Sequence, residues 1–403
     1  MATFATSESV EADAHTTMSN DTIMAAWPFR ETPLRRVVVK VGSNVLALDQ
    51  GGLNSARITS LCDSLVALQK QGIEVILVSS GAVAAGRGIL KLNKRPANIP
   101  DLQAVAAVGQ GALMEEYSHQ FRRHGVVPAQ LLLTRDDLAD RRRYINVRLA
   151  MLSLLKRGVI PIVNENDSVT IEELKFGDND MLSAMVAAKM EADLLVIMSN
   201  VPGLMTGHPK YKPDATLIPL VKKIDASVES LVHAEGSEFG VGGMQTKLQA
   251  AKHATNFGVF TLLLNGNEDG ILRGLMNGTV AGTLFTAQRR KRSRQRHIHW
   301  IGAARPRGTV VVDDGAGKAL LGHKSLLPVG VKFVRGEFAK GDVVAIVSEQ
   351  DRTLAQGISN YDAATLARIS GKRREQIVEL LGAEDYAEAV HCDNLVLLPG
   401  NDG

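Results

Sequence analysis

The stretch Val37-Val38-Val39-Lys40-Val41-Gly42-Ser43-Asn44 decides the fold of this 403-residue chain. Four valines around a single lysine predict a strand buried on both faces, as in a parallel sheet. The glycine that follows predicts a turn towards a helix. Because a buried ammonium without a partner is costly, Lys40 either reaches out at the end of the strand or meets an anion there. We favour the second interpretation, with a phosphate as the anion.

Outward from this strand, short β-branched runs alternate with longer amphipathic stretches between residues 36 and about 285. The expected strands are Arg36–Val41, Glu74–Ser79, Val127–Leu132, Val159–Val163, Leu194–Met198 and Val259–Leu263. Helices fit between them, and three of these helices end at a glycine suited to a C-terminal cap, namely Gly72, Gly125 and Gly158. The pattern predicts an α/β fold with an open, mainly parallel sheet sandwiched by helices.

The sequence changes character after residue 305. Short alternating runs with many glycines predict strands at Gly308–Val312, Gly330–Arg335 and Asp342–Val347, and short helices at Ala316–Leu321 and Asp362–Ile369. We therefore expect a first domain at residues 35–287, a linker at 288–305 and a small, mostly β barrel domain at 306–403. Residues 1–34 are acidic and lack an apolar segment, which predicts a disordered extension. The alternative is an arm that becomes ordered against a partner subunit.

The composition, 45% apolar and 22% charged, is that of an ordinary globular protein. Two distant cysteines, Cys62 and Cys392, favour neither a disulfide framework nor a structural zinc site and indicate a cytoplasmic protein. No apolar run approaches the roughly 20 residues that cross a membrane. The net charge is +3, with six positive residues in one run: Arg289, Arg290, Lys291, Arg292, Arg294 and Arg296. We interpret this run as a solvated linker, the alternative being a patch for phosphate groups or RNA.

Polar, glycine-rich segments follow the expected strands, where ligands bind in an open α/β sheet. They are Lys40 with Gly42-Ser43-Asn44, then Ser79-Ser80-Gly81-Ala82, Asn164-Glu165-Asn166-Asp167 and Ser199-Asn200. Gly42 and Gly81 each open a turn towards a helix whose backbone N–H groups can hold an anion. A glycine after a strand is also an ordinary turn residue, but two such turns beside a lysine favour an anion site.

Two more segments carry candidate chemistry. Gly177-Asp178-Asn179-Asp180 precedes a helix expected at 181–190, where one acidic residue could act as a cap. Three successive polar groups better fit contacts to a substrate amine, a lysine or a metal. Gly240–Lys247 is a glycine-rich loop entering a helix, but it lacks the residue order of a P-loop, and no GxGxxG follows a strand. A P-loop ATPase and a Rossmann dehydrogenase are disfavoured, whereas two lysines and glycine turns suit phosphoryl transfer.

These segments resemble, in this order, the glutamate 5-kinases of the amino acid kinase superfamily. The motifs that carry the resemblance are VVVKVGSNVL, VSSGAVAAGRG, AAVGQGALM, LLLTRDDL, NENDSV, FGDNDMLSAMVA and GVGGMQTKLQAA. The second domain, with GTVVVDDGAGKALL, SLLPVGVKFVRGEFAKGDVVAI and AQGISNYDA, is similar to a PUA domain. The resemblance implies the amino acid kinase fold followed by a PUA-like barrel.

It also implies the ATP-dependent phosphorylation of the side-chain carboxylate of L-glutamate to L-glutamyl 5-phosphate, the first step of proline biosynthesis, with Mg²⁺ carried by ATP rather than by a protein side chain. By this resemblance Lys40 and Lys247 are catalytic and Asp180 positions both of them. The implied substrate-binding residues are Ser80, Gly81, Asn164, Asp167, Asp178 and Asn179. The implied ATP-binding residues are Lys40, Gly42, Ser43, Ser199, Asn200, Val241, Gly242, Gly243, Met244, Gln245, Thr246 and Lys247.

The resemblance further implies a homo-oligomer, a dimer or tetramer, and proline as a feedback inhibitor. Two departures from the family pattern affect nucleotide preference: Ser199-Asn200 stands where Thr-Asp is usual, and Val241 where threonine is common. RNA is not an expected partner, because residues 306–403 hold 11 Lys and Arg against 14 Asp and Glu. Two alternatives stay open, a sibling kinase of another small carboxylic acid and an RNA-interacting protein acting through the PUA-like domain.

Overall fold

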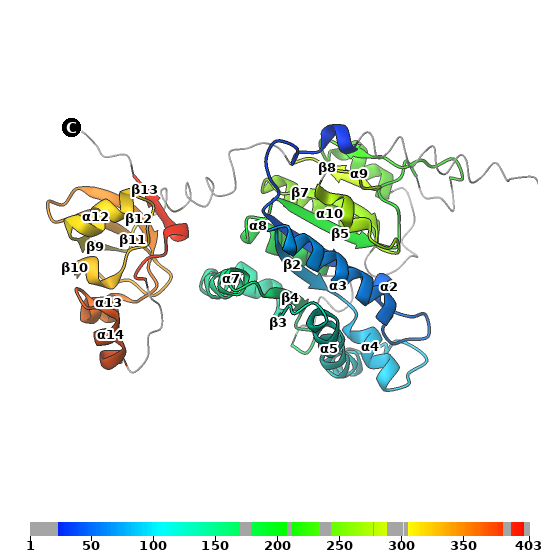
Figure 1. Ribbon diagram of the computed structural model, residues 1–403, viewed down its shortest axis with the longest axis horizontal. Helices are drawn as coiled ribbons and strands as arrows, with labels where there is room; N and C mark the ends of the chain where they lie inside the picture. Colours follow the sequence, from blue (N-terminus) through cyan, green and yellow to red (C-terminus); the bar gives the residue numbers. More distant parts are fainter. Residues whose placement is uncertain are drawn as a thin grey trace, which may run out of the picture. The chain divides into compact units, whose positions relative to one another are not determined.

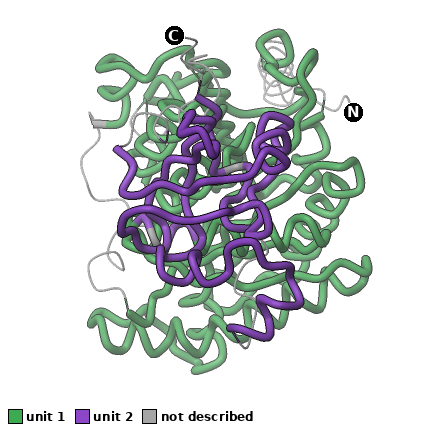
Figure 2. The backbone as a smooth tube through the Cα atoms, turned by 90° about the vertical axis from the view of Figure 1, so that its left-hand side faces the viewer, with its two compact units in different colours: residues 1–140, 146–289 green, residues 141–145, 290–403 purple. Residues whose placement is uncertain are grey.

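The computed structural model describes residues 23–169, 179–207, 212–233, 243–276, 278–287, 301, 305–381 and 388–398. The chain divides into two compact units (Figure 2). The first comprises residues 1–140 and 146–289, and the second comprises residues 290–403 with the short segment 141–145. Each unit is organised around its own β-sheet.

The first unit contains an eight-stranded sheet in the order β3-β4-β2-β1-β5-β7-β8-β6 (Figure 1). Its strands are β1 (Arg36–Val41), β2 (Glu74–Ser79), β3 (Pro128–Leu133), β4 (Ile160–Glu165), β5 (Leu194–Ser199), β6 (Leu220–Val221), β7 (Phe260–Asn265) and β8 (Thr283–Phe285). All pairings are parallel except that between β7 and β8. The predicted open, mainly parallel sheet is therefore confirmed.

Helices connect these strands and cover both faces of the sheet. They are α2 (Ser43–Leu46), α3 (Ser55–Lys70), α4 (Ala82–Ile89), α5 (Ile99–Arg122), α6 (Arg135–Ala139), α7 (Arg141–Lys156), α8 (Asn179–Lys189), α9 (Ala226–His233) and α10 (Met244–Asn256), with a 3₁₀ segment η2 (Ile271–Met276). Three of the helices, α3, α5 and α7, are followed by the positive-φ glycines Gly72, Gly125 and Gly158, as the sequence predicts.

Alternation along β1 separates two hydrophobic cores. Val37, Val39 and Val41 join the core that contains the buried residues of α3 and α5. Val38 joins the opposite core, formed with α7, α8 and α10. Since side chains two residues apart share a face of a strand, Lys40 lies on the side of Val38 and therefore faces α8.

The N-terminal prediction is wrong for residues 23–34. Ile23, Trp27 and Leu34 are buried in the core that also contains η2, and the Trp27 ring packs edge-on against Phe29 at 5.4 Å between centroids. Phe29 in turn packs against Phe260 of β7. The acidic composition predicts disorder, but these few apolar residues are enough to anchor the segment on its own unit. Residues 1–22 lie outside the described residues.

Several strand boundaries differ from the predicted ones by one or two residues. The most consequential is β4, which extends to Glu165 and so includes Asn164 and Glu165, which we expected to follow the strand. The helix expected at 181–190 begins at Asn179, which places Asp180 in its first turn. Strands β6 and β8 were not predicted, because two and three residues are too few for a periodic signal.

The second unit has a five-stranded sheet in the order β10-β9-β11-β12-β13. The strands are β9 (Gly308–Val312), β10 (Val331–Arg335), β11 (Val343–Ser348), β12 (Thr353–Ile358) and β13 (Leu395–Leu397). The helices α12 (Asp314–Leu321), α13 (Ala363–Ile369) and α14 (Arg374–Leu381) and the 3₁₀ segments η3 (Pro328–Gly330) and η4 (Cys392–Asn394) accompany them. This is the predicted small, mostly β unit, although β12, β13 and α14 were missed. The basic run at 289–296 lies outside the described residues.

Candidate active site

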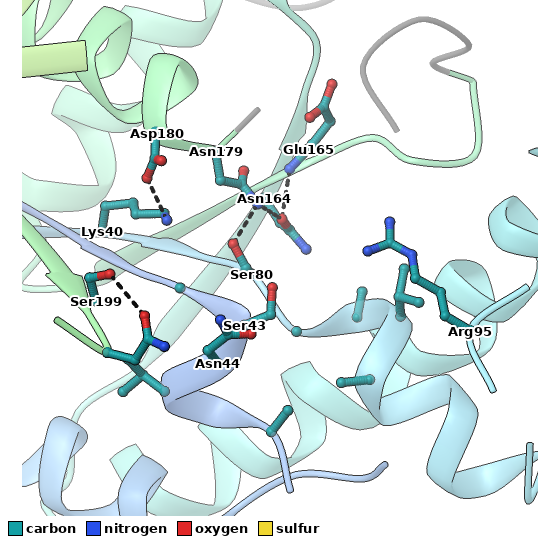
Figure 3. Close-up of a pocket in the computed structure, with 18 of the residues that line it drawn as sticks. Lys40, Ser43, Asn44, Ser80, Arg95, Asn164, Glu165, Asn179, Asp180 and Ser199 are labelled. Carbon is teal, nitrogen blue, oxygen red and sulfur yellow. Dashed lines mark hydrogen bonds and ion pairs between the residues drawn. The ribbon is translucent and has the colours of Figure 1, made fainter. Parts of the chain in front are cut away.

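A polar cavity of about 730 Å³ opens at the carboxyl ends of β1, β2, β4 and β5. Its lining combines the expected strand-end segments with residues from the loops beyond them (Figure 3). The lining residues expected from the sequence are Lys40, Gly42, Ser43, Ser80, Gly81, Asn164, Asp167, Asn179, Asp180, Ser199, Asn200 and Lys247. Parallel strands bring their carboxyl ends to one edge, so residues distant in sequence meet there.

Asp180 lies between two lysines. Its Oδ1 is 2.6 Å from Lys40 Nζ, and its Oδ2 is 3.3 Å from Lys247 Nζ. Thr246 Oγ1 also donates a hydrogen bond to Asp180 Oδ2, at 2.7 Å. All three charged residues are buried, with exposed fractions of 5% for Lys40, 1% for Asp180 and 8% for Lys247. Because it contains two cations and one anion, this cluster brings a net positive charge to the part of the cavity that it lines.

The electrostatics of this cluster favour a bound anion. Burial alone would raise the pKa of Asp180, but Lys40 and Lys247, with the hydrogen bonds from Lys40 and Thr246, hold it below its usual value. Burial lowers the pKa of Lys247, and the Lys40 charge acts in the same direction against the attraction of Asp180. An incoming phosphate would relieve the repulsion between the two ammonium groups, because it supplies the second negative charge.

The second part of the site is built around Ser80 and Asn179. Gly81 has a φ of 112°, a conformation that favours glycine, and it turns the chain from β2 into α4. Asn179 Nδ2 donates to Ser80 Oγ at 2.9 Å and to Asn164 Oδ1 at 2.9 Å. Asn164 Oδ1 also accepts the backbone N–H of Glu165, at 2.8 Å. The ends of β2 and β4 and the start of α8 are thereby tied together.

Asp167 and Arg95 line the same cavity. Burial raises the pKa of Asp167 to about 6, and the charge of Arg95 acts against that rise. A carboxyl group with this pKa is charged at neutral pH. Because burial disfavours that charge, a cationic partner would stabilise it. Such a group suits a substrate ammonium.

The nucleotide residues expected from the sequence are only partly gathered at the cavity. Gly42 donates its N–H to the Met198 carbonyl, which keeps the first turn against β5. Ser199 Oγ donates to Asn200 Oδ1 at 3.4 Å. From α10 the cavity is lined by Lys247, whereas Gly243, Met244 and Gln245 are not among its lining residues and Thr246 reaches it only through Asp180. Val241, Gly242 and Asp178 lie outside the described residues.

Sequence reasoning missed several polar residues of the cavity. These are Asp49, Arg87, Arg95 and Asn267, together with Glu165, which was noted but given no role. Gln110 of α5 was also missed, although its Oε1 accepts a hydrogen bond from Asn164 Nδ2 at 2.8 Å. Asp49, Arg87, Arg95 and Gln110 belong to helices or loops away from strand ends, so a search restricted to strand ends could not find them. The AAVGQ segment was an available signal for Gln110.

Residues 35–262 match the model of the amino acid kinase family, and residues 308–381 match that of the PUA domain. The chain belongs to the amino acid kinase family, in a form that carries a PUA domain.

Its relatives give a more specific result. The chain is 46% identical to a glutamate 5-kinase of Trichlorobacter lovleyi, over 91% of this chain and 97% of the relative. It is 48% identical to one of Geobacter metallireducens, over 91% and 98% of the two chains. It is 44% identical to one of Moorella thermoacetica, over 90% and 96%. The similarity to glutamate 5-kinases thus extends through both units.

In the part of the chain that the structure describes, no helix is long and apolar enough to span a membrane. The same residues contain no cluster of three or more His, Cys, Asp or Glu side chains suited to a metal ion.

Proposed function

We propose that the cavity is where this chain transfers the γ-phosphoryl group of ATP to the side-chain carboxylate of L-glutamate. The activity follows from full-length relatives that are glutamate 5-kinases. It yields L-glutamyl 5-phosphate, the first intermediate of proline biosynthesis from glutamate. The observation that supports this placement best is the buried pair of lysines held by Asp180.

The reaction requires little covalent participation from the protein. An oxygen of the ionised carboxylate attacks the γ-phosphorus, a new O–P bond forms, and the bond from the γ-phosphorus to the bridging oxygen of ADP breaks. No general base is needed, since the carboxylate is already a nucleophile at neutral pH. Lys40 and Lys247 would contact the transferring phosphoryl group, where negative charge spreads over its oxygens in the transition state. Asp180 would keep both ammonium groups in place.

The substrate's amino-acid end would occupy the other part of the cavity. Ser80, Gly81, Asn164 and Asn179 supply polar groups at the ends of β2 and β4, and Asp167 supplies the negative charge for the α-ammonium. Asp178, which the resemblance also assigns to this end, is outside the described residues. Gly42, Ser43, Ser199 and Asn200 would lie along the nucleotide.

The cavity suits magnesium that arrives with ATP. Mg²⁺ is commonly held by one or two carboxylates together with phosphate oxygens and water. The described residues offer no cluster of three carboxylates for the ion, and of the acidic residues that line the cavity Asp167 is assigned to the α-ammonium and Asp180 to the lysines. The ion would neutralise charge on the β- and γ-phosphates, and phosphate oxygens together with water would supply most of its ligands.

The remaining expectations concern partners. We propose that the chain forms a homo-oligomer and is inhibited by proline, both on the strength of its resemblance to glutamate 5-kinases, and that it acts in the cytoplasm. RNA is not a proposed ligand, because residues 306–403 carry an excess of acidic over basic side chains. Filter binding of RNA at low and physiological salt is expected to show no salt-sensitive retention.

The test of the proposed function uses hydroxylamine to trap the acyl phosphate as a hydroxamate while ADP release is followed. Glutamate is expected to give hydroxamate, and N-acetylglutamate to give little. Lys40→Ala should abolish the signal with glutamate. Turnover of another carboxylic acid in place of glutamate would leave the kinase family standing and overturn the substrate assignment.

A further inference from the structure

Four side chains form a continuous relay from α5 to the substrate end of the cavity. Asn164 Nδ2 donates to Gln110 Oε1 at 2.8 Å, Asn179 Nδ2 donates to Asn164 Oδ1 at 2.9 Å, and Asn179 Nδ2 also donates to Ser80 Oγ at 2.9 Å. Figure 3 shows Asn164, Asn179 and Ser80 turned towards one another. Gln110 is not a lining residue of the cavity, so it would act only through Asn164.

The relay has a fixed polarity. A side-chain amide presents an acceptor oxygen on one side and a donor NH₂ on the other. The backbone N–H of Glu165 fixes the polarity, because it donates to Asn164 Oδ1 and cannot act as an acceptor. Asn164 therefore turns its oxygen towards Asn179 and its NH₂ towards Gln110, whose Oε1 accepts that NH₂ and holds it in place. Asn179 must then present its own NH₂ to Asn164 and Ser80.

Because Asn179 bonds to Asn164 and Ser80 through its NH₂ group, its Oδ1 bonds to neither of them. This atom is buried and accepts no hydrogen bond from the residues that the structure describes, although Asn179 lines the cavity. A buried acceptor left without a donor destabilises the folded protein, and a ligand that donates to it removes that cost. The site therefore calls for a ligand that donates a hydrogen bond at this position, and it disfavours one that presents only acceptors.

We propose that Gln110 is a positioning residue that, through Asn164, orients Asn179 Oδ1 as an acceptor for the substrate's free α-ammonium group. This inference rests on the proposed function, because L-glutamate is the ligand that brings the ammonium. Asp167 supplies the compensating charge in the same cavity. The relay gives the site a preference for an unmodified amino acid over a deaminated acid of the same length.

The test compares glutamate with glutarate, which has the same carboxylates but no amino group. Gln110→Met keeps the length of the side chain and removes its acceptor. We expect the KM for glutamate to rise about ten- to a hundredfold, as for the loss of a hydrogen bond to a charged group. The kcat and the KM for ATP should stay within about threefold, and the inhibition constant of glutarate, competing with glutamate, within about twofold.

A second variant, which replaces Gln110 but keeps its acceptor, tests the proposal separately from Gln110→Met. Gln110→Glu retains an acceptor towards Asn164, and it loses no hydrogen bond because Gln110 Nε2 is buried without a partner among the described residues. It should keep the wild-type ratio of glutamate KM to glutarate inhibition constant, and a lost preference for glutamate in this variant would overturn the proposal. Gln120→Met is the matched control, since Gln120 is a buried amide on the same helix that donates to Glu116 at 2.9 Å.

The results that would contradict the role of Gln110 differ from those that would contradict the proposed function. An unchanged glutamate KM in Gln110→Met, or an equal weakening of glutamate and glutarate, would overturn the role of Gln110 while leaving the kinase activity in place. Absence of glutamate phosphorylation in the wild-type chain would remove the proposed function, and this inference with it.

Discussion

Lys40 Nζ lies 2.6 Å from Asp180 Oδ1, which joins the first strand of the sheet to the first turn of α8 across 140 residues of sequence. The contact exists because Lys40 shares a face of β1 with Val38, and that face is covered by α8. Both side chains are almost fully buried, so neither charge is stabilised by bulk water. Asp180 pairs with Lys247 as well, and a phosphate would complete the balance of charges.

Replacing Asp180 tests this arrangement directly. Asp180→Asn keeps the shape of the side chain but leaves two buried ammonium groups facing each other. We expect kcat to fall at least a hundredfold, because the lysines would no longer be held against the transferring phosphoryl group. Steady-state assays of ADP release measure it, with the exposed Asp225→Asn as a control of equal charge change. A variant with nearly wild-type kcat would contradict the positioning role of Asp180.

Lys247 is expected to act mainly in the transition state. Lys247→Ala should lower kcat by about two orders of magnitude while the KM for glutamate changes less than about threefold, since the charge it meets grows during transfer. Lys252→Ala on the same helix, an exposed lysine paired with Glu229, is the matched control and should leave both constants unchanged. Equal losses in kcat and in glutamate affinity for Lys247→Ala would argue for ground-state binding instead.

Asp167 gives the reaction a pH dependence. Its pKa is raised to about 6, so the group is ionised at pH 7 and protonated at pH 5. Only the ionised form can pair with the α-ammonium, and kcat/KM for glutamate should therefore fall as the pH drops through about 6, approaching tenfold per pH unit below it. Asp167→Asn should have a low kcat/KM with this transition removed. A transition that persists in Asp167→Asn would assign the titration to another group.

A close approach of α4 and α5 supports the Gly81 turn. A Cβ on Gly109 would lie 1.8 Å from the Ala82 carbonyl oxygen, so the two helices could not pack as they do. Gly109→Ala should lower the free energy of unfolding by about 2–4 kcal/mol and raise the KM for glutamate, because Ser80 and Gly81 lead directly into α4. Urea unfolding and KM measurements check both effects.

The same helix offers a matched control. A Cβ on Gly111 meets nothing within 4 Å, and Gly111→Ala should be neutral or stabilise the protein by up to about 1 kcal/mol through its helix propensity. Similar destabilisation by the two variants would show that helix packing is not the reason for the effect at Gly109.

The N-terminal segment should contribute strongly to stability. Trp27 is 3% exposed and packs against Phe29, and Gly278 leaves no room for a side chain beside its ring. Trp27→Ala is expected to cost about 3–5 kcal/mol, measured by urea unfolding, and to leave the KM for glutamate unchanged, because Trp27 does not line the cavity. A loss below about 1 kcal/mol would mean that the segment docks only weakly.

Local patterns in the sequence were sufficient to predict most of the sheet and the edge at which the cavity opens. Runs such as Val37–Val41 predict buried parallel strands by composition alone, and topology requires their carboxyl ends to meet at one edge. This is why the sequence predicts Lys40, Ser80, Asn164 and Ser199 at one edge of the sheet, where all four line the cavity. The motifs then indicated phosphoryl transfer, and the family comparisons agree with that function.

Tertiary structure determined the contacts that depend on the direction of side chains and on the distance between them. Three contacts join segments that share no local sequence signal. Arg95 reaches the cavity from the loop after α4, Gln110 accepts a hydrogen bond from Asn164, and Trp27 fills a space beside Gly278. The pKa of Asp167 likewise depends on burial, which a sequence does not state. Composition and periodicity predicted most of the strands to within one or two residues, whereas packing alone determined which buried polar groups face each other, because hydrogen bonds and ion pairs act over a few ångströms.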